Sequence, residues 1–149
     1  LEIAAYLAGF AEYRRPLLEH LLNVKSKHWD DAVRQLAARS AAVLAPLDGE
    51  WATSTMLPAL FPNTLSPDLR ERHGAMIMVA EVVRGLCNSL HGGLGTGLPA
   101  ELRKQISGLV PAIEKARMYR GRGGEVMRGA TCRMLEVCAT IRMPCSADR

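Results

Sequence analysis

Apolar residues recur at helical spacing in three long stretches of this chain, and a shorter apolar stretch precedes each of them. The long stretches span residues 26–44, 66–90 and 123–141. In each, apolar or small side chains recur every three or four positions, which places them on one face of a helix. These faces contain, in chain order, Val33, Leu36, Ala37, Ala41 and Leu44; Ala75, Met78, Val79, Val82 and Leu86; and Met127, Ala130, Thr131, Met134, Leu135 and Cys138. The alternation predicts a chain of helical hairpins.

The long stretches also share a loose signature, an arginine followed by an alanine. It comprises Arg34-x-x-Ala37, Arg72-x-x-Ala75 and Arg128-x-Ala130. The first two arginines are 38 residues apart and the second and third are 56 apart, whereas HEAT and armadillo repeats run about 40–47 residues. Stacked hairpins bury a core that no single pair could bury alone. We therefore predict an all-α fold, an α-solenoid of HEAT/armadillo-like helical hairpins, with a compact helical bundle as the alternative.

Proline and glycine indicate where the helices begin and end. Pro16 suits the first position of a helix, and Pro46 with Gly49 is expected to end the stretch of residues 26–44. Ser66 is the expected N-cap of the longest helix. Pro111 predicts a break in the helix around it, because proline lacks the N–H that an interior helical position donates.

Composition agrees with a folded helical chain. Hydrophobic residues make up 48% and charged residues 23%, whereas aromatic residues make up only 5%, and runs of strand-forming residues are absent. No stretch resembles a signal peptide, and none approaches the ~20 apolar residues of a membrane span. We expect residues 1–149 to form one continuous helical-repeat segment of about three helix pairs, a fragment of a much longer chain.

The charge balance is mild, since 19 basic and 15 acidic residues give a net charge of +4. The arginines are spread along the sequence, whereas nucleic-acid-binding proteins usually concentrate basic residues on one face. We therefore expect neither a nucleic-acid nor a membrane partner.

The four cysteines, Cys87, Cys132, Cys138 and Cys145, form no CxxC pair. A zinc site would need closer ligands or a convergent pair of histidines. The interpretation is a cytoplasmic protein with buried, reduced thiols and no metal site.

The block His28-Trp29-Asp30-Asp31 gathers residue types that could form a site. Asp30 suits an N-cap or a first helical turn, and Trp29 could pack the helix start against the preceding helix. A catalytic His–Asp pair would also need a nucleophile nearby. We therefore interpret the block as a helix start, and we expect no chemistry from His28.

Residues 91–97, HGGLGTG, come nearest to a phosphate-binding loop, but they lack the Lys-Ser/Thr of a P-loop and follow no strand. They are interpreted as a flexible loop. No nucleophile–base pair appears elsewhere, so no catalytic residue and no cofactor are predicted.

Two clusters are candidates for contact with a partner molecule. One comprises Arg70, Arg72 and His73 at the start of the longest helix, although His73 also suits a structural role. The other comprises Tyr119, Arg120 and Arg122 on a glycine-rich turn ahead of the last helix, where guanidinium and N–H groups could receive a carboxylate or phosphate.

Several blocks of the sequence together resemble the family of tubulin-folding cofactor D. They are SKHWDDAVRQLAARSAAVLAPL, TLSPDLRERHGAMIMVAEV, YRGRGGEVMRGATCRMLEV and RMP, in this order. The preceding AGFAEYRRPLLEHLL is also similar to that family, so the resemblance runs from about residue 6 to residue 144. Each block is weakly specific, and their shared order carries the resemblance.

The resemblance implies a large HEAT/armadillo-type chaperone of the cytoplasm and microtubule cytoskeleton, with this chain from its middle-to-C-terminal region. Such proteins capture β-tubulin, and they assemble and dismantle the α/β-tubulin heterodimer with cofactors C and E and an Arf-like small GTPase. With those cofactors they promote GTP hydrolysis by tubulin, so the resemblance implies a GTPase activator that is not itself an enzyme. The residues alone leave an alternative, a generic helical-repeat protein that binds nucleic acid or another protein.

Overall fold

The computed structural model describes residues 2–143, and within this range the chain is helical and contains no strand. Short 3-10 turns at Lys25–Lys27, Ala45–Asp48, Pro62–Leu65 and Gly95–Gly97, and one π-helical turn at Ala52–Met56, join the α-helices. The α-helices are α1 (Glu2–Ala8), α2 (Ala11–Asn23), α3 (Asp31–Leu44), α4 (Gly49–Trp51), α5 (Leu57–Leu60), α6 (Leu69–Leu90), α7 (Ala100–Lys115) and α8 (Gly124–Thr140).

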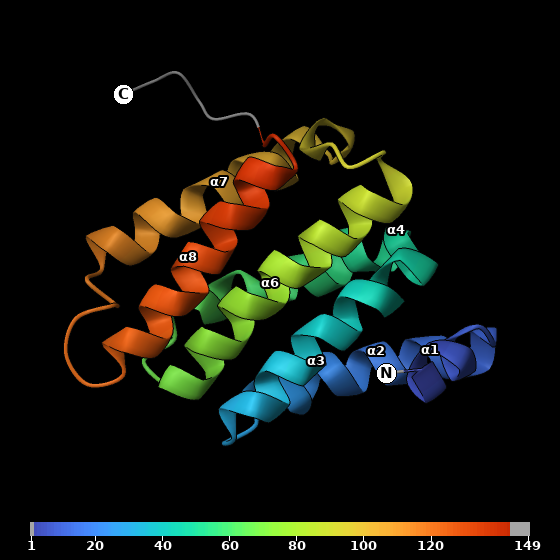
Figure 1. Cartoon of the computed structure of the whole chain (residues 1–149), viewed down its shortest axis with the longest axis horizontal. Coiled ribbons are helices and arrows are strands. Elements are labelled where there is room, and N and C mark those ends of the chain that lie inside the picture. Colours follow the sequence, from blue (N-terminus) through green and yellow to red (C-terminus); the bar gives the residue numbers. More distant parts are fainter. Residues whose placement is uncertain (1, 144–149) are drawn as a thin grey trace.

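The helices form two layers (Figure 1). Helices α3, α6 and α8 run side by side in one layer and begin at the same end of the molecule, with α6 in the middle in contact with both neighbours. Helices α2, α5 and α7 contact α3, α6 and α8, respectively, from the other layer. This order of stacked hairpins confirms the predicted all-α, helical-repeat architecture of an α-solenoid.

The core is centred on α6, whose side chains are buried from Arg72 to Cys87 except at Arg84. The predicted apolar face of α6 is confirmed, since every member of it is buried. The faces predicted for α3 and α8 are each wrong at one position: Leu36 and Leu135 are 46% and 52% exposed. Only α6 has neighbours on both sides and behind it, whereas α3 and α8 each have a side that no described helix covers.

Small residues let α6 approach the preceding hairpin closely. A Cβ on Gly74 would collide with the carbonyl oxygen of Ser26, and a Cβ on Gly85 would collide with that of Ala42. The facing part of α3 is rich in buried alanine, including Ala38 and Ala41. Because overpacked cores are destabilised, these glycines fix how closely the first two hairpins stack.

A charged group joins α6 to α8. The carboxylate of Glu81, a residue that is 5% exposed, accepts from Arg84 Nη2 at 2.6 Å and from Arg133 Nε of α8 at 2.7 Å. A buried carboxylate is costly unless it is paired. The arginine of α8 therefore provides a specific contact between the second and third hairpins.

Two predicted helix boundaries at proline are wrong. Pro16 lies inside α2 rather than at its start, and α7 continues through Pro111 without a break. Both prolines are exposed, so the carbonyl oxygens that they leave without a helical donor can face water. Within the predicted stretch of residues 26–44 the helix begins at Asp31 and ends at Leu44, close to the prediction, but the chain then continues through short helical turns to Leu65.

Candidate partner-binding surface

The start of α3 is held by hydrogen bonds within its own loop. The side chain of Asp30 caps the helix by accepting from Ala32 N at 2.8 Å, and Asp30 N donates to His28 Nδ1 at 3.1 Å. Arg34 Nη1 then donates to the carbonyl oxygens of His28 and Trp29, at 2.7 and 3.0 Å. The predicted role of Asp30 as an N-cap is confirmed.

The start of α6 repeats this arrangement 38 residues later. Asp68 accepts from Arg70 N at 2.8 Å, and Asp68 N donates to Ser66 Oγ at 3.2 Å. Arg72 Nη1 donates to the carbonyl oxygens of Ser66 and Pro67, at 2.6 and 3.2 Å. The N-cap is therefore Asp68 and not Ser66. In both helices the arginine of the sequence signature binds the loop that precedes its own helix, and we call this arrangement the loop clamp.

A polar cluster connects the first clamp to the second hairpin. Arg34 Nε donates to His73 Nδ1 at 3.1 Å, and Asp31 Oδ1 lies 3.3 Å from Arg34 Nη2 and 3.4 Å from His73 Nδ1. Burial lowers the pKa of His73 to about 4; Asp31 opposes this shift and Arg34 adds to it. His73 is therefore neutral near pH 7 and can accept the hydrogen bond from Arg34.

Two residues of the first predicted partner cluster are buried, since Arg72 is 8% and His73 1% exposed. Their polar atoms serve the loop clamp and the contact between hairpins. The third, Arg70, is exposed and binds Asp68 at 2.7 Å. This hydrogen bond lowers the pKa of Asp68 to about 2. Arg70 alone of the three offers a side chain to a partner.

Trp29 does not pack against the preceding helix, as the sequence had suggested, because it is 73% exposed. Its ring lies 5.4 Å from the ring of His28, between centroids, and its carbonyl is held by Arg34. The loop clamp fixes the backbone of this residue, and the indole side chain projects from the surface.

The second predicted cluster lies on the turn between α7 and α8. Arg120 and Arg122 are exposed and form no ion pair with any side chain among residues 2–143, whereas Tyr119 is partly buried against the core. Gly123, the N-cap residue of α8, has φ 80° and lies against Leu69, so this turn adjoins the start of α6. The structure therefore brings the exposed part of both predicted clusters to the same end of the molecule.

The excess positive charge is concentrated in one segment, contrary to the expectation that the basic residues are spread along the chain. Residues 100–123 contain six basic and two acidic residues, an excess equal to the net charge of the whole chain. None of the six forms an ion pair within the described part of the chain; they are Arg103, Lys104, Lys115, Arg117, Arg120 and Arg122. A count of charge in windows along the sequence would have found this segment, which comprises α7 and the turn after it.

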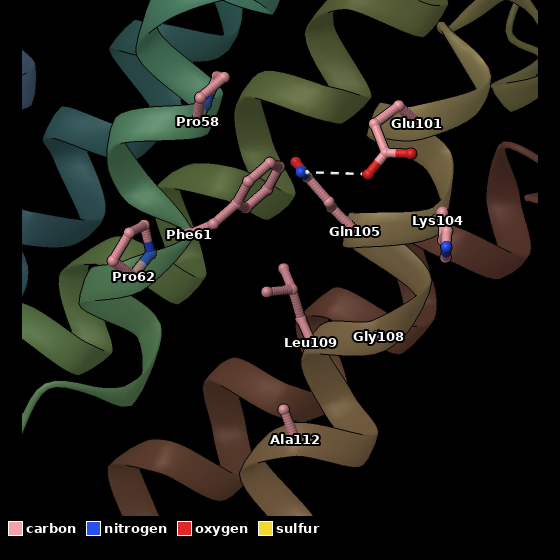
Figure 2. Close-up of a pocket in the computed structure, with 9 residues that line it drawn as sticks. All are labelled: Pro58, Phe61, Pro62, Glu101, Lys104, Gln105, Gly108, Leu109 and Ala112. Carbon is pink, nitrogen blue, oxygen red and sulfur yellow. Dashed lines mark hydrogen bonds between the residues drawn. The ribbon is translucent and has the colours of Figure 1, made fainter.

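A surface groove of about 490 Å³ lies between the α5 segment and α7, and we call it the α5–α7 groove. Figure 2 shows Phe61 and Leu109 directed into it from opposite walls. The residues that line it are Pro58, Phe61, Pro62, Glu101, Lys104, Gln105, Gly108, Leu109 and Ala112. Its walls are mainly apolar, with polar side chains from the first turns of α7.

Of the cysteines, Cys87 and Cys132 are free, and Cys138 is partly buried. Burial raises the pKa of Cys87 to about 11, so its thiol is protonated near neutral pH. Cys132 is exposed, which contradicts the expectation that all the thiols are buried, and Cys145 lies outside the described residues.

Acidic, histidine and cysteine side chains form no group of three or more that could hold a metal ion, as far as residues 2–143 show. Among the helices described, none is both long and apolar enough to cross a membrane.

Comparison with known proteins agrees with the resemblance seen in the sequence. The chain is 27% identical over 124 residues to a tubulin-specific chaperone D of Dictyostelium discoideum. The match covers 83% of this chain but only 8% of the chaperone, so the chain spans a small part of the length of that relative. No family model matches the chain. No solved structure matches it either.

Proposed function

We propose that this chain is a segment of a tubulin-folding chaperone and acts as a binding scaffold, not as an enzyme. The observation that carries the proposal is the similarity to a tubulin-specific chaperone D along 83% of the chain. Stacked hairpins supply extended surfaces suited to gripping another protein. The proposal follows the resemblance in its details: the complete protein binds β-tubulin and assembles and dismantles the α/β-tubulin heterodimer in the cytoplasm, near microtubules.

The proposal includes further partners. These are cofactors C and E and an Arf-like small GTPase, and together with the two cofactors the protein activates GTP hydrolysis by tubulin. Within the chain, we assign partner contact to Arg70, Tyr119, Arg120 and Arg122. Arg72 and His73 are left out because their side chains are buried.

Affinity capture tests the proposal with the longest natural chain that contains this sequence. Tagged protein is recovered from a cell lysate, and β-tubulin and the Arf-like GTPase are quantified by mass spectrometry. We expect both to be enriched, and we expect the double variant Arg120→Glu/Arg122→Glu to reduce the recovery of β-tubulin about tenfold. The control is Arg39→Glu/Lys25→Glu, which makes the same change in charge on the first hairpin. Absence of both partners would contradict the proposal.

The alternative is a helical-repeat protein that binds nucleic acid. The concentration of basic residues in residues 100–123 favours this alternative, because nucleic-acid-binding proteins concentrate positive charge. The sequence pI of about 9.1 points the same way. Such binding would weaken steeply with salt, because cations of the protein release counterions from phosphates. The test is an electrophoretic mobility-shift assay with a labelled single-stranded RNA or duplex DNA at about 50 mM salt, where such binding is strong. Absence of a shift removes this alternative.

A further inference from the structure

The α5–α7 groove exists because the helices of one layer pack directly against each other, whereas α5 and α7 of the other layer do not. In one layer, α6 and α8 pack directly against each other. In the other, α7 contacts the turn Pro62–Leu65, and the apolar walls beside that contact stay apart. Gly108 lies in the α7 wall, and a Cβ built on it would have no atom within 4 Å. The chain's own described side chains therefore leave this apolar surface open.

The walls of the groove suit apolar side chains. Pro58, Phe61 and Pro62 form one wall, and Leu109 and Ala112 belong to the other (Figure 2). Peptides that bind such grooves insert apolar residues spaced three or four positions apart, and a groove along a helix such as α7 accepts that spacing.

The charges along α7 indicate that a partner bound in the groove carries negative charge. Lys104 lies at the groove and is exposed, without an ion pair among the described residues. Lys115 and Arg117 follow Ala112, where α7 ends and the turn begins. The groove is thus apolar inside, and its lining includes one carboxylate, Glu101, which accepts from Gln105, and one unpaired cation, Lys104. With the two cations beyond Ala112, the excess charge beside the groove is positive, which is complementary to an apolar segment flanked by carboxylates.

We propose that the α5–α7 groove binds an acidic amphipathic segment of a partner protein. Apolar side chains of that segment enter between Phe61 and Leu109, and its carboxylates meet Lys104 and the cations that follow α7. The inference rests on the proposed scaffold function and names the surface and the partner chemistry. A nucleic acid fits less well, because proline, phenylalanine and leucine form most of the groove walls, whereas nucleic-acid binding depends chiefly on cations that neutralise phosphates.

Two open glycines provide a matched pair of variants. Gly108 of α7 and Gly129 of α8 are both interior helical positions where an added Cβ meets nothing within 4 Å, but only Gly108 lines the groove. Gly108→Glu and Gly129→Glu therefore make the same change in charge and helix propensity. A second pair is Lys104→Glu in the groove and Arg39→Glu on α3, where Arg39 is an exposed cation without an ion pair in the described residues.

The probe is a fluorescein-labelled helical peptide of about 20 residues, with leucine at positions i, i+3, i+4 and i+7 and glutamate at most other positions. Its binding to the longest natural chain that contains this sequence is measured by fluorescence anisotropy. We expect Gly108→Glu and Lys104→Glu to raise the Kd about tenfold, and Gly129→Glu and Arg39→Glu to change it less than about twofold. Circular dichroism checks that all four variants fold. A peptide with lysine in place of glutamate is expected not to bind.

Equal affinities for the Gly108→Glu and Gly129→Glu proteins would overturn the inference. Tighter binding of a labelled single-stranded RNA than of the acidic peptide, weakened by the same two groove substitutions, would also overturn it. The outcome is separable from the proposed function. Peptide binding that depends on Gly108 without any capture of β-tubulin contradicts the proposed partner alone, whereas capture of β-tubulin by a protein that ignores the peptide contradicts the groove alone.

Discussion

The starts of α3 and α6 are built alike within their loops but differ in how they bind the next hairpin. Each has an aspartate N-cap and an arginine four residues later that binds two carbonyl oxygens of the preceding loop. Arg34 also donates its Nε to His73 on the neighbouring helix, whereas Arg72 Nε is buried with no partner among residues 2–143. The clamp is thus local to each hairpin, whereas the hydrogen bond between hairpins forms only where the next helix supplies an acceptor, as His73 does for Arg34.

The start of α8 differs from both, because it has no aspartate cap and only part of the clamp. Gly123 takes the N-cap position with no side-chain cap, and Arg128 Nη1 reaches Tyr119 O at 3.2 Å from an exposed position. The first two long helices begin with the same capped loop, 38 residues apart, whereas α8 begins after a glycine turn that carries unpaired arginines. The helix starts of the first two hairpins are therefore the most alike, and the third differs by the exposed, unpaired arginines of its turn.

The largest effect is expected where α6 meets the loop of the first clamp. Gly74→Ala places a Cβ against the carbonyl oxygen of Ser26 and close to Arg34, so the hairpins must separate. We expect a loss of about 3 kcal/mol in the free energy of unfolding, measured by urea denaturation. Gly129→Ala is the control, because it meets nothing and should gain up to about 1 kcal/mol. Equal stabilities would show that the close approach is unimportant.

The two clamp arginines should then be separable. Arg34→Met leaves two carbonyl oxygens and His73 without their donor, and we expect a loss of about 2–3 kcal/mol. Arg72→Met removes bonds to two carbonyl oxygens and also an unpaired buried N–H, so the expected loss is about 1 kcal/mol. The same urea titration measures both. A larger loss for Arg72→Met would contradict the view that the contact with His73 makes the first clamp stronger.

The pH dependence sharpens the same difference. The pKa of His73 is about 4 in the folded chain and about 6.5 when unfolded, so between these values the unfolded chain binds the extra proton. Stability should therefore be complete above pH 6.5 and fall as the pH drops toward 4. His73→Gln should flatten the curve of unfolding free energy in that range. The lowered pKa values of Asp68 and Glu71 affect stability only at and below the acid end of this range, because the two carboxyl groups ordinarily titrate at pH 3.8 and 4.5. An unchanged slope in His73→Gln would contradict the assignment.

The smallest effect is expected at the surface of the first clamp. Trp29→Ala should change the free energy of unfolding by less than about 0.5 kcal/mol, because the side chain is 73% exposed and Arg34 binds only its backbone carbonyl. Thermal unfolding followed by circular dichroism measures this change. A loss above 1.5 kcal/mol would restore the sequence-based view that Trp29 packs the helix start onto the preceding helix.

Sequence periodicity predicted the long helices and the buried face of α6, but it did not predict that the other faces of α6 are buried as well. It failed at Leu36 and Leu135, which have the right spacing but lie on sides of α3 and α8 that no described helix covers. Proline rules failed at Pro16 and Pro111 because both lie on exposed helix faces. Of the predicted partner residues, Arg72 and His73 are buried, since an arginine in a first helical turn can fold back onto its own loop.

The sequence by itself determined the elements that depend on neighbours along the chain: the helices, the aspartate cap of α3 and the repeated arginine of the clamp. These follow from hydrogen bonds and side-chain spacing within a few residues. The tertiary structure decided what depends on the separation between hairpins, namely the bond from Arg34 to His73, the burial around all of α6 and the open groove beside Gly108. Such contacts join residues that are far apart in sequence, so one helix's pattern cannot specify which neighbour it will meet or how closely.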